Sequence, residues 1–169
     1  MTITKILCGC AVFAFAVQTA SAQTKHSLSG TCAKPDIEQS VPAGDLPGHT
    51  FMIAQGKCTA TDEIAGAMSK EAAFSEHRDV TAGRVKAWGI YVETYGSGDK
   101  VFYSYQSSLD MKNGAVKSGK NTYHATSGTG KMKGIKETGT CTYGAGTDGG
   151  NSFSCTGDYT LVGVAPTAK

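Results

Sequence analysis

Seven tyrosines are the residues of this sequence whose type and placement most clearly suggest a binding site. All of them lie between residues 91 and 159: Tyr91, Tyr95, Tyr103, Tyr105, Tyr123, Tyr143 and Tyr159. A phenol ring has apolar faces and one hydroxyl, so tyrosines around an enclosed interior can hold an aromatic or fatty ligand. The four that we expect to bind such a ligand are Tyr91, Tyr103, Tyr105 and Tyr123. The alternative is that they follow ordinary β propensity and fill a core.

The acidic residues and histidines form no recognisable catalytic set. Glu76, His77 and Asp79 could serve acid–base chemistry, but neighbours on a strand point to opposite faces. A cofactor-free enzyme would need a polar group in a water-poor cavity, which Glu93 or a tyrosine could supply. The four histidines lack the spacing of metal ligands, and Ser127 lacks the G-x-S-x-G context of a hydrolase nucleophile. We therefore assign no catalytic residue, no metal and no cofactor.

The glycine-rich segment SGTGKMKGIKETGTCTY, residues 127–143, could in principle cradle a phosphate. The dinucleotide fingerprint is G-x-G-x-x-G, whereas Gly128, Gly130 and Gly134 are one residue too far apart. A Walker loop requires Gly-Lys-Ser/Thr, but Met132 follows Lys131. Glycine also permits positive φ angles and close packing of backbones. The segment is therefore predicted to form the corner of a sheet.

Six lysines between residues 112 and 136 form the one marked charge feature, because no acidic residue lies among them. The three that we expect to contact an anion are Lys131, Lys133 and Lys136. Such a patch could meet anionic components of a cell envelope, although lysines more often protect strand edges and solvate loops. The chain without its first 22 residues has 15 basic and 14 acidic residues. This balance gives no general attraction to nucleic acid.

The first 22 residues have the three-part pattern of a secretory signal peptide. Lys5 precedes an apolar run over residues 6–17, and small residues follow at Ala20-Ser21-Ala22. We expect cleavage after Ala22 and a periplasmic or secreted protein; the alternative, lipidation at Cys10, is less consistent with the pattern.

Four cysteines remain after this cleavage. They are Cys32, Cys58, Cys141 and Cys155. In an exported chain, four cysteines typically form two disulfides, with three pairings possible. We favour Cys32–Cys58 and Cys141–Cys155, because each bridge joins neighbouring segments.

Short alternating segments separated by turn residues predict an all-β sandwich or barrel. The clearest is VKAWGIYVETYGSGDKVFYSYQSS, a hairpin whose loop spans residues 95–99. Trp88, Ile90 and Val92 share one face of its first strand, and we expect them in the core. Residues 23–48, with three prolines, are predicted to be an irregular segment, with one short strand around Ser27–Ala33, before a β domain at 49–169. The stretch DEIAGAMSKEAA is predicted to be a helical turn or loop.

SGTGKMKGIKETGTCTY resembles the Gly-Gly-Thr-Gly-Lys-Phe-x-Gly-Ile-x-Gly-x-Gly pattern of the allene oxide cyclase-like and dirigent-like β-barrel superfamily, which includes small exported bacterial proteins. ETYGSGDKVFYSY is similar to the hairpin that precedes this pattern. The resemblance covers roughly residues 81–161. It implies a calycin-like or allene oxide cyclase-like fold, a closed or nearly closed antiparallel β-barrel of about eight strands.

Such a barrel is either filled or holds one small apolar ligand. The leading hypothesis is an exported protein that binds a small hydrophobic ligand, or contacts the envelope, without catalysis. A second is a cofactor-free isomerase or cyclase, since the plant relatives cyclise substrates or steer radical coupling in their cavities. A third is a structural or inhibitory protein that acts through its outer surface. No catalytic residue of the superfamily can be matched to this chain.

Overall fold

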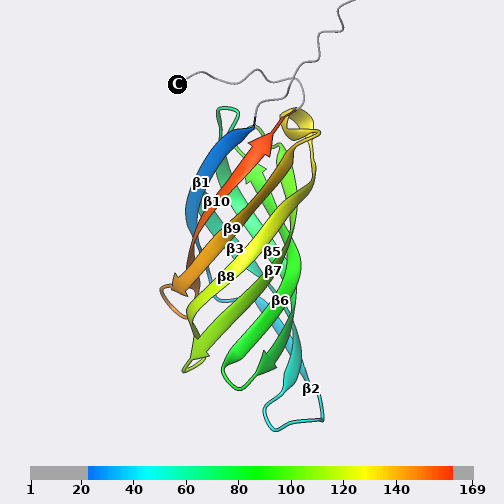
Figure 1. Ribbon diagram of the computed structural model, residues 1–169, viewed down its shortest axis with the longest axis vertical. Coiled ribbons are helices and arrows are strands. Elements are labelled where there is room, and N and C mark those ends of the chain that lie inside the picture. Colours follow the sequence, from blue (N-terminus) through cyan, green and yellow to red (C-terminus); the bar gives the residue numbers. More distant parts are fainter. Residues whose placement is uncertain (1–22, 162–169) are drawn as a thin grey trace, which may run out of the picture.

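The computed structural model describes residues 23–161, and the predicted signal peptide lies outside this range. The described part is almost entirely β structure, wound into a tall barrel (Figure 1). In chain order its elements are β1 (Thr24–Cys32), β2 (Ile37–Pro42), β3 (Thr50–Thr61), β4 (Glu63–Ile64), β5 (Ala67–Thr81), β6 (Arg84–Tyr95), β7 (Lys100–Lys112), β8 (Ala115–Gly128), the 3-10 turn η1 (Gly130–Met132), β9 (Lys136–Ala145) and β10 (Asn151–Thr160). No helix in residues 23–161 has the length and apolarity needed to cross a bilayer.

Eight antiparallel strands close the barrel, which confirms the predicted fold class. From β5 to β10 each strand pairs with the next, and β1 then pairs with β10. β3 pairs with β1 over Ser29–Cys32 on one side and with β5 on the other, which closes the ring. Closure satisfies the backbone hydrogen bonds that an open sheet would leave exposed. β2 pairs with the first half of β3, and β4 forms a short hairpin with β5.

The first half of the chain differs from the sequence-based expectation. Residues 23–48 were expected to be irregular apart from a short strand around Ser27–Ala33, but the strand there, β1, begins at Thr24 and belongs to the barrel, and β2 pairs with β3. Pro35 lies between these two strands and Pro42 ends β2, so neither proline interrupts a strand. The stretch DEIAGAMSKEAA, expected to be a helical turn or loop, forms β4, a tight turn at Ala65–Gly66 and the start of β5.

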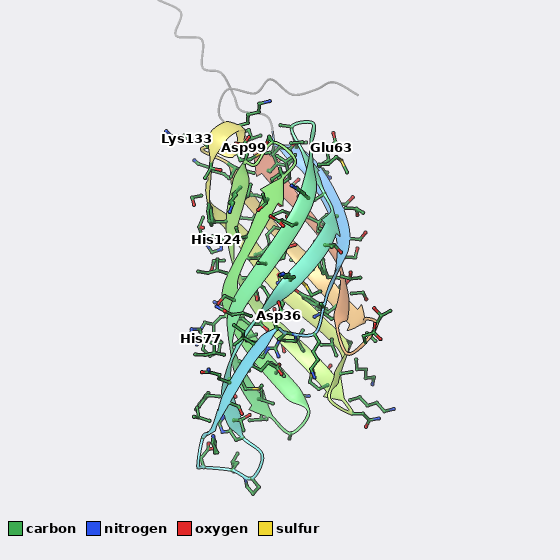
Figure 2. The ribbon with its side chains drawn as sticks, turned by 180° about the vertical axis from the view of Figure 1, so that it is seen from behind. Asp36, Glu63, His77, Asp99, His124 and Lys133 are labelled. Atoms are coloured by element: carbon green, nitrogen blue, oxygen red, sulfur yellow. A yellow bond between two sulfur atoms is a disulfide. The ribbon has the colours of Figure 1, made fainter. Side chains whose placement is uncertain are left out.

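The orientation of β6 also corrects the sequence analysis. Its two faces were separated as predicted, but Trp88 and Ile90 lie outside the barrel, where their side chains are 47% and 54% exposed. Tyr91, Glu93 and Tyr95 point inward instead. The same apolar outer surface continues over β2 and β3. His77, labelled in Figure 2, lies on this surface, and its ring stacks on Trp88.

The two disulfides have the predicted pairing. Cys32 lies directly opposite Cys58 on β1 and β3, and Cys141 lies directly opposite Cys155 on β9 and β10. All four side chains point into the barrel, so each bridge links two adjacent strands from within. Two structural disulfides are consistent with an oxidising, exported environment.

The glycine-rich segment forms a sheet corner, as predicted. β8 enters it, η1 turns the chain over one end of the barrel, and β9 leaves it. A Cβ atom at Gly128 would lie 2.2 Å from the carbonyl oxygen of Met132, so only glycine fits this close approach. The Met132 side chain is fully buried and closes this end of the barrel together with apolar neighbours: Ile64, Tyr95, Val101, Ile135 and Leu161. We call this the plugged end.

Candidate functional site

A cavity of about 180 Å³ occupies the barrel interior. It extends to the surface at the end opposite η1, where the exposed residues Lys34, Gly114 and Gly149 line it. We call this the open end. At its other limit, close to the plugged end, Glu93 and Glu137 line the cavity; we call this the inner end. The cavity therefore leads from solvent to buried carboxyl groups.

The middle of the cavity has apolar walls. Inward side chains alternate with outward ones along every strand, so each strand contributes one or more wall residues. The apolar wall residues include Leu28, Phe74, Leu109, Val116 and Phe153, and the Cys141–Cys155 bridge lies beside them. Such a surface favours the hydrocarbon or aromatic part of a ligand.

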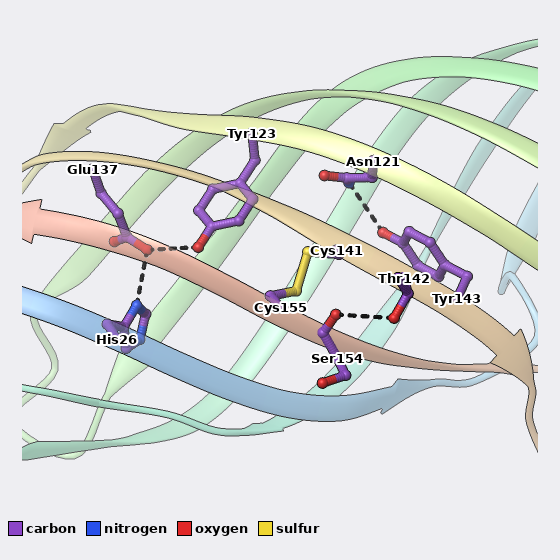
Figure 3. The surroundings of a disulfide bond; sticks show 9 residues. All are labelled: His26, Asn121, Tyr123, Glu137, Cys141, Thr142, Tyr143, Ser154 and Cys155. Atoms are coloured by element: carbon purple, nitrogen blue, oxygen red, sulfur yellow. Dashed lines mark hydrogen bonds and ion pairs between the residues drawn. A yellow bond between two sulfur atoms is a disulfide. The ribbon is translucent and has the colours of Figure 1, made fainter.

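The structure places all four predicted tyrosines on the cavity wall. Tyr91, Tyr103 and Tyr123 surround the inner end, and Tyr105 lies farther toward the open end. The ring centroids of Tyr91 and Tyr103 are 6.1 Å apart, and those of Tyr103 and Tyr123 are 5.7 Å apart. Tyr143, which the sequence analysis did not select, also lines the cavity and accepts a hydrogen bond from Asn121 (Figure 3). Ligand contact by these tyrosines remains a prediction.

Two glycines make room for Tyr123. A Cβ atom at Gly139 would lie 2.4 Å from the Tyr123 hydroxyl, and one at Gly157 would lie 2.6 Å from it. These glycines face each other across β9 and β10. The Tyr123 ring therefore packs directly against the backbone of β9 and β10, and its hydroxyl lies 3.0 Å from Glu137 Oε1.

A chain of buried polar contacts backs the inner end. The imidazole of His26 binds the carboxylate of Asp62 through Nε2, and its Nδ1 lies 3.2 Å from Glu137 Oε1 (Figure 3). The hydroxyl of Tyr95 donates to Asp62 at 2.7 Å. The hydroxyl of Tyr103 donates to Glu137 Oε2 at 3.0 Å. One histidine thus joins two carboxylates, and three tyrosine hydroxyls complete their hydrogen bonding.

His26 is a cation in this network. Burial by itself would lower the pKa of His26, but its contacts with Asp62 and Glu137 outweigh burial and raise the pKa to about 10. The imidazole is therefore protonated at neutral pH and compensates part of the charge of the two carboxylates. None of these three residues was identified as functional from the sequence, because they are far apart in the chain. His26 lies on β1, Asp62 just before β4 and Glu137 on β9.

Glu93 is the unusual group of the cavity. Its side chain lines the inner end and the residue is only 1% exposed. Burial, and next the neighbouring charge of Asp62, raise the pKa of Glu93 to about 8. Its Oε1 atom has no hydrogen-bond partner within residues 23–161, and neither has the hydroxyl of Tyr91. Glu93 is therefore mostly a neutral acid at pH 7, with hydrogen-bonding capacity left for a ligand.

A second polar group lies nearer the open end. The Arg78 guanidinium is 2.6 Å from Glu76 and 3.0 Å from Glu38, which belongs to β2. Glu76 also accepts a hydrogen bond of 2.6 Å from Tyr105. These charges are mutually paired, unlike Glu93. His77 and Asp79 do not join Glu76, because the strand turns them to the outside, as alternation predicts.

The predicted anion-contact lysines gather beside the plugged end. Lys131 and Lys133 flank the buried Met132, and Lys136 starts β9; all three are exposed. None has a carboxylate within 4 Å in the described part of the chain. Lys112, Lys117 and Lys120 lie toward the open end instead, so the six lysines do not form one surface. Anion contact by Lys131, Lys133 and Lys136 remains a prediction.

The fold and the site define a disulfide-linked, eight-stranded antiparallel barrel with an aromatic cavity that ends in buried carboxyl groups. No protein-family model matches the chain, and no curated protein sequence matches it. Among solved structures, the pterocarpan synthase dirigent protein GePTS1 is similar, with a TM-score of 0.48 and 11% sequence identity. The match covers 89% of this chain and 92% of that chain. No residue role is transferred from it.

Proposed function

We propose that this protein is an exported binding protein that holds one small, largely apolar ligand inside its barrel. The observation that supports this proposal is the cavity of about 180 Å³, which has apolar and aromatic walls and extends to the surface. A concave, mostly apolar pocket with a few converging polar groups is the usual form of a small-molecule site. The tyrosine rings provide contact area, and the inner end provides the hydrogen bonds that orient the ligand.

Two substitutions on neighbouring positions of β7 test this proposal. Ser107 is buried and lines the cavity, whereas Ser108 is exposed on the outer face. We expect Ser107→Trp to fill the cavity and weaken binding of a hydrophobic fluorescent dye by about tenfold or more, equivalent to about 1.4 kcal/mol. Ser108→Trp is the matched control and should leave binding unchanged. Thermal melts of both variants establish that each is folded.

The dye experiment has a clear negative outcome. If the folded Ser107→Trp protein binds dyes and fatty acids as well as the Ser108→Trp protein, the ligand does not enter the barrel. If the wild-type protein binds none of them at high micromolar concentration, the proposal fails.

A cofactor-free isomerase or cyclase is a second candidate, and Glu93 is the observation that favours it. A neutral carboxylic acid at the end of an enclosed cavity can donate a proton to a bound substrate. Glu137 lies at the same end as a carboxylate held by His26, Tyr103 and Tyr123. The two carboxyl groups could therefore take the roles of acid and base.

This second candidate predicts a defined pH profile. Because the protonated form of Glu93 would be the active one, turnover should be present below pH 8 and fall as the pH rises through the pKa of about 8. Glu93→Gln should abolish it. The assay is chiral chromatography of the cyclised product of a fatty-acid allene oxide, the substrate type suggested by the family resemblance. A racemic product that forms equally fast without protein would exclude this activity.

A further inference from the structure

The inner end of the cavity combines three aromatic rings with carboxyl groups. Tyr91 and Tyr103 are tilted by 55° to each other, and Tyr103 and Tyr123 meet nearly edge to face at 80°. All three residues line the cavity beside Glu93 and Glu137. A ligand group that reaches this end is therefore enclosed by tyrosine rings on several sides and by carboxyl oxygens.

The inner end has only one positively charged side chain among the described residues. His26 is the one cation that contacts these groups in the described part of the chain, and it is shared by Asp62 and Glu137. No lysine or arginine of residues 23–161 lies within 4 Å of Glu93. Arg78, a basic residue of the cavity wall, is paired with Glu76 and Glu38. Buried carboxylates without a counter-ion are costly, and a bound cation would relieve that cost.

The burial of Glu93 and its unpartnered oxygen atom are a second, independent indication of a ligand. It is 1% exposed, lines the cavity, and has an Oε1 atom without a hydrogen-bond partner among the described residues. The Tyr91 hydroxyl beside it is likewise without a partner. A buried carboxyl that only filled space would be expected to satisfy its oxygens within the protein.

We propose that the inner end binds the ammonium group of an organic amine, whose apolar body lies against the walls of the cavity. This inference rests on the proposed binding function and specifies the class of ligand. Glu93 forms an ion pair with the ammonium group, and the faces of the tyrosine rings attract it through cation–π interactions. The apolar walls receive the hydrocarbon or aromatic remainder of the ligand.

Ligand binding is then linked to the proton of Glu93. The charged or titratable groups that face Glu93 are Asp62, Glu137, His26, Tyr91, Tyr95, Tyr103 and Tyr123. Burial and these carboxylates raise the pKa of Glu93 to about 8, so an ammonium ion that arrives at pH 7 displaces its proton. Affinity should therefore rise with pH up to about 8, and fall again as the amine loses its own proton near pH 10.

Isothermal titration calorimetry with two ligands of nearly equal shape tests this proposal. 2-Phenylethylamine carries the ammonium group, and 2-phenylethanol has a neutral hydroxyl in its place. At pH 7 we expect the amine to bind about tenfold or more tightly than the alcohol. Titrations in two buffers with different ionisation enthalpies should show release of about one proton for the amine and none for the alcohol.

Substitution of Glu93 separates its role from that of the cavity. Glu93→Gln should weaken amine binding by about tenfold or more, abolish proton release and leave alcohol binding within about twofold. Glu71→Gln, at an exposed carboxyl of β5, is the matched control and should change nothing. If Glu93→Gln does not fold, the two ligands and the pH dependence in the wild-type protein still decide the question.

Each outcome has one meaning. Equal or tighter binding of the alcohol overturns the ammonium proposal but leaves the binding function intact. Amine binding that Glu93→Gln does not alter also overturns it. If neither ligand binds, the ammonium proposal fails, and the dye and fatty-acid titrations decide the proposed function separately.

Discussion

His26→Leu is expected to lower the free energy of unfolding by about 3–5 kcal/mol at pH 7, because it removes the cation shared by two buried carboxylates. Asp62 and Glu137 would then face each other without compensation, in an interior where their charge is poorly solvated. Urea denaturation followed by circular dichroism measures the effect. His124→Leu is the matched control: His124 is exposed on β8, and its loss should cost less than about 0.5 kcal/mol.

The pH dependence of this effect has a definite sign. The pKa of His26 is about 10 in the folded protein, against 6.5 for an ordinary histidine. Because the pKa of His26 is higher in the folded protein, its protonated form stabilises the folded state. This stabilisation is complete below pH 6.5 and is lost as the pH rises through 10. The difference between wild type and His26→Leu should therefore shrink between pH 7 and pH 10. A pH-independent difference over this range would show that His26 acts only by packing.

Removal of both disulfides should have a still larger effect. The bridges join residues 26 and 14 positions apart, and closure of loops of this size stabilises a fold by about 3 kcal/mol each in the chain-entropy model. Replacing all four cysteines with alanine should therefore cost about 6 kcal/mol, close to the whole stability of a typical domain. We expect that variant to be largely unfolded at 37 °C.

The single-bridge variants provide the control. Cys141→Ala with Cys155→Ala, or Cys32→Ala with Cys58→Ala, should each remain folded and lose about 3 kcal/mol in urea denaturation. If the protein without any cysteine pair unfolds at the same urea concentration as wild type, hydrogen bonding and packing of the closed barrel suffice without the bridges.

Local sequence patterns were enough to predict much of the barrel. The β6–β7 hairpin was recognisable because its alternating runs flank a glycine-containing loop. The disulfide pairing followed because each bridge joins neighbouring segments of the chain. The sheet corner at residues 127–143 followed from its glycines. Each of these features depends on residues close in the chain.

The inner face of β6 could not be identified in this way. Alternation separates the two faces of a strand, but which face is buried was inferred from hydrophobicity. In this barrel the interior contains Glu93 and tyrosines, whereas Trp88 and Ile90 lie outside. The usual rule is therefore inverted over Trp88–Glu93, although Val85 and Ala87 at the start of the strand are buried as expected.

The polar network was also beyond sequence reasoning. His26, Asp62 and Glu137 are separated by 36 residues or more, and only closure of the barrel brings them together. His26 lies just before the short strand expected around Ser27–Ala33, so no strand parity was assigned to it. Burial alternates along Thr24–Cys32 in the structure, where β1 pairs with β10.

The central claim is that the barrel interior is open to a small ligand. A crystal structure of the protein grown with 2-(4-bromophenyl)ethanol tests this most directly, because anomalous scattering locates the bromine without reference to the ligand's density. If the interior is open, a bromine peak should lie within the barrel, near Phe74, Leu109 and Phe153. A bromine found only on the outer surface around Trp88, with no peak inside the barrel, would contradict the central claim.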